Sequence, residues 1–293
     1  MKPQAILALA ATSVALLSFF GCSTAEEPPA SKPPPEFVPG AVQTTTQPAA
    51  YPTGPYGVGK GSIIPNFAFI GYANAVAKND TMQEIKLGDF YNPHGRDAAY
   101  QPASPAEDDR LYPAGSQYGE GKAKPTVLAI DVASVWCGPC NAEAKCVLPV
   151  LYERYSACNG GLFLQLQDGN TPGEAATPKN LYNWTVKQYK EDFPSAIDPA
   201  GRLGALFAAN AFPQNFIIDT ATMEIVEVIA GVPDAAYWKK YESLLADPTC
   251  PAAQPTCTTN ADCPTGKYCS TTCPADPATC VIHTCQAAGC SAS

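Results

Sequence analysis

The feature that most constrains the fold of this chain is a pair of cysteines, Cys137 and Cys140, between a buried strand and a helix. Residues 126–132 form an apolar run that carries a single acid, Asp131, a pattern typical of a strand buried on both faces. After the pair, apolar residues recur at helical spacing between positions 144 and 155. We therefore expect the two cysteines at the N-terminus of a helix that follows a central strand.

The rest of the chain alternates strand and helix patterns. Short apolar segments predict strands at 67–70, 85–87 and 162–166 and a hairpin at 214–218 and 224–229, and amphipathic patterns predict helices near 178–191, 201–209 and 234–246. This order predicts an α/β sandwich with a mixed central sheet. Residues 93–121 are rich in Pro, Gly, Asp and Tyr and indicate an inserted surface loop.

A C-x-x-C pair is compatible with a redox dithiol, half of a zinc site or a structural disulfide. Zinc needs a second pair, and no other cysteines of the chain have this spacing. A helix N-terminus favours the redox interpretation over the structural one, because its free N–H groups and dipole stabilise a Cys137 thiolate. Pro139 suits the first helical turn. We expect Cys137 to be exposed and reactive and Cys140 to be buried.

The sequence Trp136-Cys137-Gly138-Pro139-Cys140 after an apolar strand resembles the thioredoxin superfamily, and in particular its exported TlpA-type disulfide reductases. The likeness covers about residues 58–246. A second segment, 211–219, is similar to the family's cis-proline strand. By this resemblance the Phe212–Pro213 bond is cis and Phe212 offers backbone groups to a substrate; the alternative is an ordinary trans proline at a strand entry.

The resemblance also implies roles at the site. Cys137 attacks a substrate disulfide and Cys140 resolves the mixed disulfide. Asp131 accepts a proton from Cys140, and the alternative is a partnered acid in the core. Trp136, Gly138, Pro139, Phe212 and Pro213 form the substrate-binding set, although Trp136 also suits simple packing. The Gly-Pro dipeptide resembles reductases more than oxidants, and no cofactor or metal is expected.

Three departures from the family pattern stand out. The mid-helix proline, Pro149, lies later than in most relatives, so we expect a kink farther from the dithiol. Cys146 and Cys158 are additional. The insertion at 93–121 enlarges the front of the domain, where it is a candidate cover for the site.

Composition indicates an exported protein. Thirteen cysteines are too many for a reducing compartment unless they bind metal, and only two histidines, His94 and His283, are available to help. The net charge of −9 and the absence of a basic block argue against a nucleic-acid partner.

The N-terminus indicates how the protein is exported. An apolar run over 5–20 suits a signal peptide at 1–21, and Phe19-Phe20-Gly21-Cys22 resembles a bacterial lipobox with Cys22 as the lipidated residue. Residues 22–57 hold nine prolines from Pro28 to Pro55 and form an extended tether before the domain at 58–248. We expect a lipid-anchored protein on the periplasmic side of a bacterial envelope. Cleavage after Ala25, which leaves a soluble secreted or periplasmic protein, is the alternative.

The tail at 249–293 has little apolar content and predicts a small disulfide-stapled module. Its eight cysteines are Cys250, Cys257, Cys263, Cys269, Cys273, Cys280, Cys285 and Cys290. The module is a candidate surface-binding unit or a protease-resistant cap.

Ten cysteines remain for structural disulfides after Cys22 and the dithiol are set aside. Cys146 and Cys158 do not suit each other, because twelve helical residues span about 18 Å, far beyond disulfide reach. If the thioredoxin resemblance holds, Cys158 and Cys250 lie at the same distal end of two parallel helices. The resemblance then implies a Cys158–Cys250 bridge, with Cys146 paired to another tail cysteine. The alternative leaves Cys146 and Cys158 unpaired and closes the tail on itself.

Three functions of different class follow. The first is a membrane-anchored thiol–disulfide oxidoreductase that reduces a disulfide-bearing protein substrate and is itself reduced by an unknown electron donor. The second is a binding or adhesion lipoprotein that keeps an inert thioredoxin-like scaffold. The third is a metal-delivery protein, which needs a histidine near the dithiol.

Overall fold

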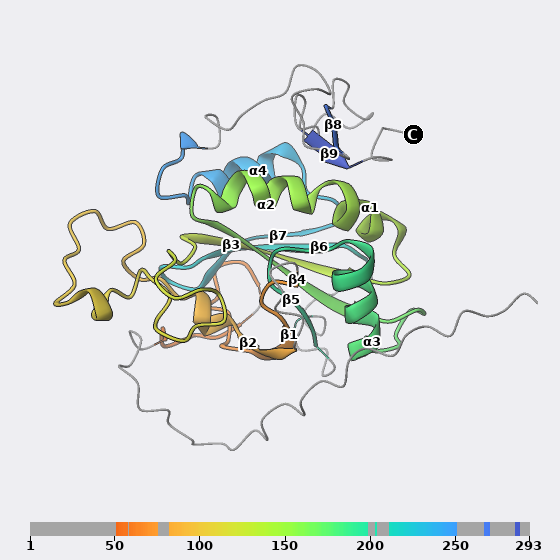
Figure 1. Cartoon of the computed structure of the whole chain (residues 1–293), viewed down its shortest axis with the longest axis horizontal. Helices are drawn as coiled ribbons and strands as arrows, with labels where there is room; N and C mark the ends of the chain where they lie inside the picture. Colours follow the sequence, from red (N-terminus) through yellow and green to blue (C-terminus); the bar gives the residue numbers. More distant parts are fainter. Residues whose placement is uncertain are drawn as a thin grey trace, which may run out of the picture.

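The computed structural model describes residues 51–57, 59–75, 82–198, 203 and 211–250, and the backbone of 267–269 and 285–287 (Figure 1). The signal peptide, the lipobox with Cys22, most of the tether and most of the tail lie outside the described residues. The predicted helix at 201–209 also lies outside them, apart from Leu203.

A mixed sheet forms the centre of the domain, as predicted, and it has seven strands. Its strands are β1 (Ala68–Tyr72), β2 (Gln83–Lys86), β3 (Val127–Ser134), β4 (Gly160–Asp168), β5 (Ser195–Ile197), β6 (Gln214–Asp219) and β7 (Glu224–Ala230). They lie in the order β2-β1-β5-β4-β3-β6-β7. Strands β3, β4 and β5 are parallel, whereas β1, β2, β6 and β7 pair with antiparallel neighbours. All eight residues of β3 are buried, because it lies between two strands and under helices.

Helices cover the sheet. They are α1 (Gly138–Cys146), α2 (Leu148–Ser156), α3 (Pro178–Leu181), the π-helix η3 (Tyr182–Gln188) and α4 (Ala235–Glu242), with short 3₁₀ turns at η1 (Leu87–Phe90) and η2 (Pro105–Glu107). Figure 1 shows α1, α2 and α4 on one face of the sheet. None of the helices in the described part of the chain is long and apolar enough to cross a bilayer.

Aromatic residues of α4 fasten this helix layer to the sheet. The Tyr237 hydroxyl donates to the carbonyl oxygen of Phe216 at 2.8 Å, and the Tyr241 hydroxyl donates to that of Gly161 at 3.0 Å. Gly160 allows this close approach, since a Cβ there would collide with the Tyr241 hydroxyl. The two rings are buried, and their hydroxyl groups keep hydrogen-bond partners through these two bonds.

Pro149 breaks the predicted dithiol helix into α1 and α2. Proline lacks an N–H and its ring clashes with the carbonyl of the residue four positions earlier, here Lys145. The α-helix therefore ends at Cys146 and a new one begins at Leu148, with Pro149 in its first turn. The kink expected at Pro149 is present as a full break around Val147.

The insertion at 93–121 is fastened to the end of the sheet where β3 begins. Arg96 donates to both carboxylate oxygens of Asp219 at 2.7 Å and to the carbonyl oxygens of Thr126 and Leu244. Farther along, Gln117 donates to the carbonyl of Glu84 in the edge strand β2. Figure 1 shows the loop projecting at the left, away from α1. The expectation that it covers the site is wrong, because its anchors lie at the opposite end of the sheet and along β2.

The packed chain begins earlier than position 58. The Tyr51 hydroxyl donates to the carbonyl of Ile64 at 2.6 Å, and the N–H of Gly57 donates to that of Ile63 at 3.0 Å. Residues 51–57, which the sequence analysis assigned to the tether, therefore belong to the folded domain.

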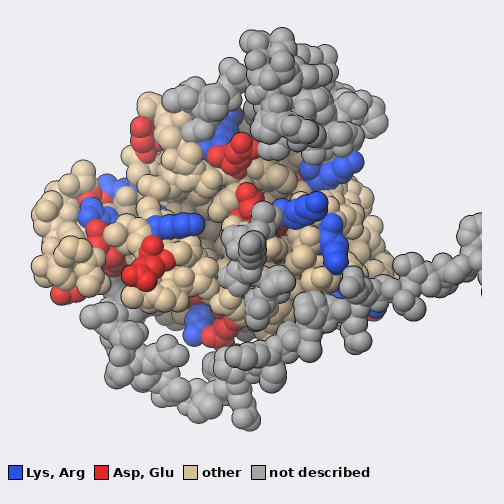
Figure 2. Space-filling model, in the orientation of Figure 1, with Lys and Arg blue, Asp and Glu red and all other residues tan. Residues whose placement is uncertain are grey.

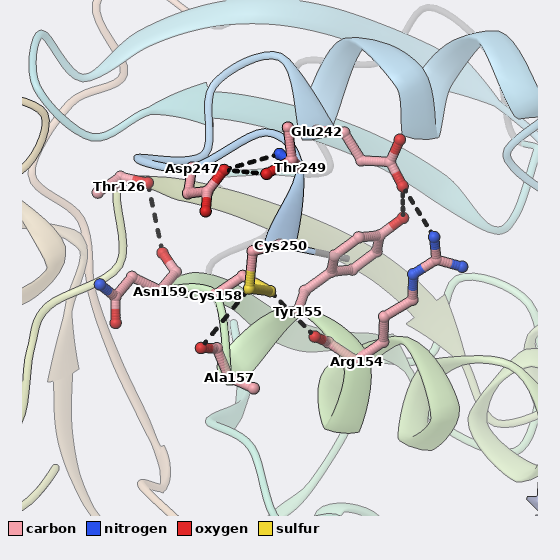
Figure 3. Close-up of a disulfide and its surroundings, with 10 residues drawn as sticks. All are labelled: Thr126, Arg154, Tyr155, Ala157, Cys158, Asn159, Glu242, Asp247, Thr249 and Cys250. Carbon is pink, nitrogen blue, oxygen red and sulfur yellow. Dashed lines mark hydrogen bonds and ion pairs between the residues drawn. A yellow bond between two sulfur atoms is a disulfide. The ribbon is translucent and has the colours of Figure 1, made fainter. Parts of the chain in front are cut away.

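A disulfide joins Cys158, two residues after α2, to Cys250 beyond α4 (Figure 3). This is the pairing that the resemblance implied. Alongside it, Glu242 of α4 accepts a hydrogen bond from the Tyr155 hydroxyl at 2.9 Å and pairs with Arg154 at 3.4 Å. Cys146 also takes part in a disulfide. The alternative with both helix cysteines unpaired is wrong; the partner of Cys146 is not among the side chains described.

Charges are mixed on the face shown in Figure 2. Acidic and basic side chains lie side by side over the insertion at the left, whereas several Lys or Arg side chains gather at the right, the end at which α1 begins.

Candidate active site

The dithiol lies at the connection between the end of β3 and the start of α1. The N–H of Cys137 donates to the carbonyl of Ser134 at 3.0 Å, which turns the chain out of the strand. Cys137 is the N-cap of α1, and its Sγ accepts a hydrogen bond from the N–H of Cys140 at 3.1 Å. The two sulfurs are joined in a disulfide. A backbone N–H aimed at Sγ is the arrangement that stabilises a thiolate once this bond is reduced.

Both cysteines are buried in this disulfide form. Cys137 is 2% exposed and Cys140 is 1% exposed. The expectation that Cys137 is exposed is therefore wrong for the oxidised state. Its neighbours Trp136, Gly138 and Pro139 are the exposed residues of the segment, with Trp136 at 38%. Sequence position at a helix end does not reveal burial, because the covering residues come from other parts of the chain.

The segment before β6 brings a proline to the same place. Gln214 pairs with Val132 near the end of β3, so Pro213 lies at the level where β3 leads to the dithiol. The peptide bond between Phe212 and Pro213 is cis. Phe212 sets its ring edge-on to Trp136, with 5.7 Å between the ring centroids.

The domain has the thioredoxin fold. A dithiol at the N-terminus of the helix after a central parallel strand, beside a cis-proline at the start of the adjacent antiparallel strand, decides this assignment. The site residues named from the resemblance thus come together at one end of the sheet.

No protein-family model matches this sequence, and no curated protein sequence is similar to it at a significant level. Among solved structures, one from Chlorobium tepidum assigned as the thiol:disulfide interchange protein DsbE has 17% identity and a TM-score of 0.41, over 65% of this chain and 99% of that one. The exposed lipoprotein thioredoxin of Streptococcus pneumoniae has 15% identity and a TM-score of 0.39, over 61% and 99%. A secreted thiol-disulfide isomerase from Corynebacterium glutamicum has 16% identity and a TM-score of 0.38, over 62% and 83%. These scores are low, so the assignment of the thioredoxin fold rests on the topology and the site.

Trp136 is held in place from two sides. Its indole N–H donates to Oδ2 of Asp168 at 3.2 Å, while its ring meets Phe212. The same Asp168 oxygen accepts the N–H of Gly173 at 2.9 Å. Asp168 therefore links the residue next to the dithiol to the loop that follows β4.

Two buried carboxyl groups lie on the elements that flank the dithiol, one on β3 and one on α1. Asp131 is 5% exposed, and its Oδ2 has no hydrogen-bond donor among the described residues. Burial, and then the negative charge of Glu191, raise the pKa of Asp131 to about 8. A small cavity of about 10 Å³, roughly the space of one water molecule, lies beside it and is lined in part by Leu148, Asn215 and Trp238.

The second carboxyl group is Glu143, which the sequence analysis missed. It is 2% exposed, and neither of its oxygens has a hydrogen-bond donor among the described residues. Burial raises its pKa well above the ordinary value, and the charge of Asp131 adds to this. The available signal was its position three residues after Cys140, on the buried stripe of the helix that also carries Ala144.

A third buried acid, Glu191, accepts three hydrogen bonds from neighbouring side chains. Its carboxylate accepts hydrogen bonds from Trp184 Nε1 at 3.0 Å, Thr185 Oγ1 at 3.1 Å and Ser195 Oγ at 2.6 Å. Burial raises its pKa to about 7 despite these donors. It is therefore a structural acid that also disfavours negative charge at Asp131.

Within the described part of the chain, no three His, Cys, Asp or Glu side chains form a group that could hold a metal ion.

Proposed function

We propose that this protein is an extracytoplasmic thiol–disulfide oxidoreductase that reduces protein disulfides through Cys137 and Cys140. The observation that carries the proposal is the disulfide between these residues at the N-terminus of α1, beside the cis-proline Pro213. A purely structural disulfide needs neither a donor aimed at Sγ nor an adjoining exposed tryptophan.

The reaction starts from the reduced protein. The Cys137 thiolate attacks one sulfur of a substrate disulfide, forms a mixed disulfide and expels the other substrate sulfur as a thiolate, which takes up a proton. The Cys140 thiol then gives up its proton and attacks Sγ of Cys137. The mixed disulfide breaks, the second substrate thiol leaves, and the protein ends as the disulfide seen here. Two electrons have passed to the substrate, and a dithiol donor must restore them.

Resolution needs a base near Cys140, and the buried acids are the candidates. Glu143 lies one helical turn after Cys140, and Asp131 lies in β3 beneath α1. Because their pKa values are raised by burial, they hold protons more readily than surface carboxylates do. The Asp131 carboxyl group, with a pKa of about 8, can exchange a proton with a thiol near neutral pH.

The substrate is expected to approach over Trp136, Gly138 and Pro139, which are exposed. Phe212, before the cis bond, is partly exposed beside them and offers its backbone to an extended substrate segment. Access to the Cys137 sulfur requires this rim to shift, since Cys137 is buried in the disulfide form. We infer the reductase direction from the Gly-Pro dipeptide between the cysteines.

The anchor is part of the same proposal. Lipid on Cys22 and the proline-rich segment after it would hold the domain at a membrane surface, as one chain-linked attachment rather than a span. Replacing Cys22 with Ala should move the protein from a detergent-requiring fraction to a soluble one. Unchanged fractionation would favour the soluble alternative.

The decisive experiment follows reduction of an insulin-type disulfide substrate by the soluble domain with a small dithiol as donor, and compares Cys137→Ser. Turnover that the variant loses supports the oxidoreductase. Equal rates support an inert scaffold with a binding role, an alternative favoured by the burial of both sulfurs.

A further inference from the structure

The residue directly after the dithiol makes an unusual set of contacts. Asn141 lies in the first turn of α1, where asparagine is a poorer helix former than alanine. Its amide nitrogen Nδ2 donates to the carbonyl oxygen of Val135 at 3.0 Å and to that of Cys137 at 2.6 Å. Both carbonyls belong to the connection between β3 and α1.

These bonds bridge the whole turn that carries the nucleophile. The carbonyl of Cys137 also accepts the backbone N–H of Asn141 at 3.1 Å, so it has two donors from one residue. Asparagine inside a helix often bonds the carbonyl four residues earlier, and here it reaches past it to Val135 as well. The backbone on both sides of Trp136 is thereby tied to the helix that Cys137 caps.

The other end of the Asn141 side chain is also held. Its Oδ1 accepts a hydrogen bond from the Tyr189 hydroxyl at 2.5 Å, which leaves Nδ2 pointing at the two carbonyls. Tyr189 is itself supported by Trp184, whose ring packs against it in a T shape at 4.8 Å. Trp184 in turn donates to the buried Glu191. The segment 182–191 thus orients Asn141.

We propose that Asn141 is a positioning residue of the dithiol, which holds the turn 135–137 so that the Cys140 N–H points at the Cys137 sulfur. The inference rests on the proposed redox function, and it adds a residue that touches neither sulfur in the described contacts. Tyr189 is its orienting partner. When the disulfide is reduced, the S–S bond no longer holds the two cysteines together. The position of the turn 135–137 relative to α1 then depends more on the Asn141 hydrogen bonds.

Three variants test the proposal. Asn141→Leu keeps the shape of the side chain, improves helix propensity and removes all three hydrogen bonds. Tyr189→Phe keeps the ring and removes the bond to Oδ1, together with the hydrogen bond that the Tyr189 hydroxyl accepts from Gln188 Nε2 at 2.7 Å. Asn183→Ala, at an exposed position of η3, is the control for an asparagine change outside this network.

The measurement is the rate at which iodoacetamide modifies Cys137 in the reduced full-length protein, from pH 5 to pH 10. We expect Asn141→Leu to slow modification about threefold or more near pH 6, where the thiolate needs the N–H donor, and to match the natural protein near pH 10. Tyr189→Phe should show a smaller loss of the same kind. The reduction potential of the dithiol should become more negative in both, because the reduced form is less stabilised.

Wild-type alkylation profiles in both variants, with folding intact by circular dichroism, would overturn the proposal. If Asn141→Leu fails to fold, the Tyr189→Phe profile decides. Alkylation and potential are measured without a substrate, so these readouts are separate from the turnover assay that tests the proposed function.

Discussion

The indole nitrogen of Trp136 lies 3.2 Å from Oδ2 of Asp168, and this one carboxylate oxygen also receives the N–H of Gly173. The hydrogen bond restrains the exposed aromatic side chain beside a disulfide whose two cysteines are buried. Under the proposed function Trp136 shields the dithiol, and the bond to Asp168 would help to hold it there.

Releasing Trp136 should make the disulfide easier to reach. Asp168→Ala removes the acceptor, and we expect the Cys137–Cys140 disulfide to be reduced by a small dithiol about two- to tenfold faster, the factor that one hydrogen bond allows. Stopped-flow tryptophan fluorescence measures this rate. Glu120→Ala, an exposed position in the insertion, is the control. No acceleration in Asp168→Ala would show that the tryptophan is held by packing alone.

The Cys158–Cys250 disulfide should stabilise the domain. It links residues 92 positions apart, and closing a long loop in the unfolded chain is worth about 2–5 kcal/mol. The double variant Cys158→Ala/Cys250→Ala should lower the free energy of unfolding by an amount in this range, measured by urea denaturation. The double change is used because a single one leaves a free thiol.

Peptide mapping under non-reducing conditions checks the same bridge directly. A peptide that joins Cys158 to Cys250 is the expected product. Recovery of Cys158 as a free thiol, or a double variant as stable as the natural protein, would contradict the stapling role.

Asp131 should make stability fall as pH rises. Its pKa is raised in the folded protein, from 3.8 to about 8, so the folded state binds the proton more tightly than the unfolded chain does. The stabilisation is complete below about pH 4 and is lost as pH increases toward 8. Asp131→Asn keeps the shape without the charge, and we expect it to raise the free energy of unfolding at pH 8 by on the order of a few kcal/mol.

Urea denaturation at pH 5 and pH 8 measures this difference. Asp131→Asn should flatten the change in stability between the two pH values. A pH dependence as steep as that of the natural protein would mean that Asp131 is ionised in the fold.

The buried acids should act at the second chemical step. Asp131→Asn and Glu143→Gln each remove a candidate base, and loss of general base catalysis typically costs a factor of about a hundred or more. We expect at least one variant to accumulate the mixed disulfide between Cys137 and a model peptide, while the first attack proceeds at the natural rate. Acid quenching followed by mass spectrometry separates the two steps.

The double variant Asp131→Asn/Glu143→Gln shows which of the two acids is the base. If one acid alone is the base, the double variant should resolve as slowly as that single variant. Normal resolution in all three proteins would make both carboxyl groups structural.

The local patterns of the chain predicted much of this fold. The apolar run at 126–132 became β3, which is buried along its whole length, and the positions assigned to strands β4, β6 and β7 carry strands. Strand β5 was missed, because Ser195–Ile197 is only three residues long and has no alternation to detect. A strand this short depends on its neighbours β4 and β1 for its hydrogen bonds.

Helix boundaries were less well predicted. The single dithiol helix divides at Val147, since Pro149 removes a donor and clashes with the preceding turn. The region 178–191 forms a short α-helix followed by a π-helix. Glu191 is bonded to Trp184, Thr185 and Ser195, and these tertiary contacts determine how the segment ends.

The sequence by itself determined the nature of the dithiol site. The residues that define it, Trp136 to Cys140, are consecutive, and they lie between a buried-strand pattern and a helical pattern. The position of Pro213 before an apolar strand was equally visible. Only the tertiary structure decided that Cys137 is buried in the disulfide form, that Glu143 of α1 is buried with no hydrogen-bond donor among the described residues, and that the insertion lies at the far end of the sheet. Burial, raised pKa values and loop placement depend on contacts between residues that are far apart in the sequence, and a local sequence pattern does not reveal such contacts.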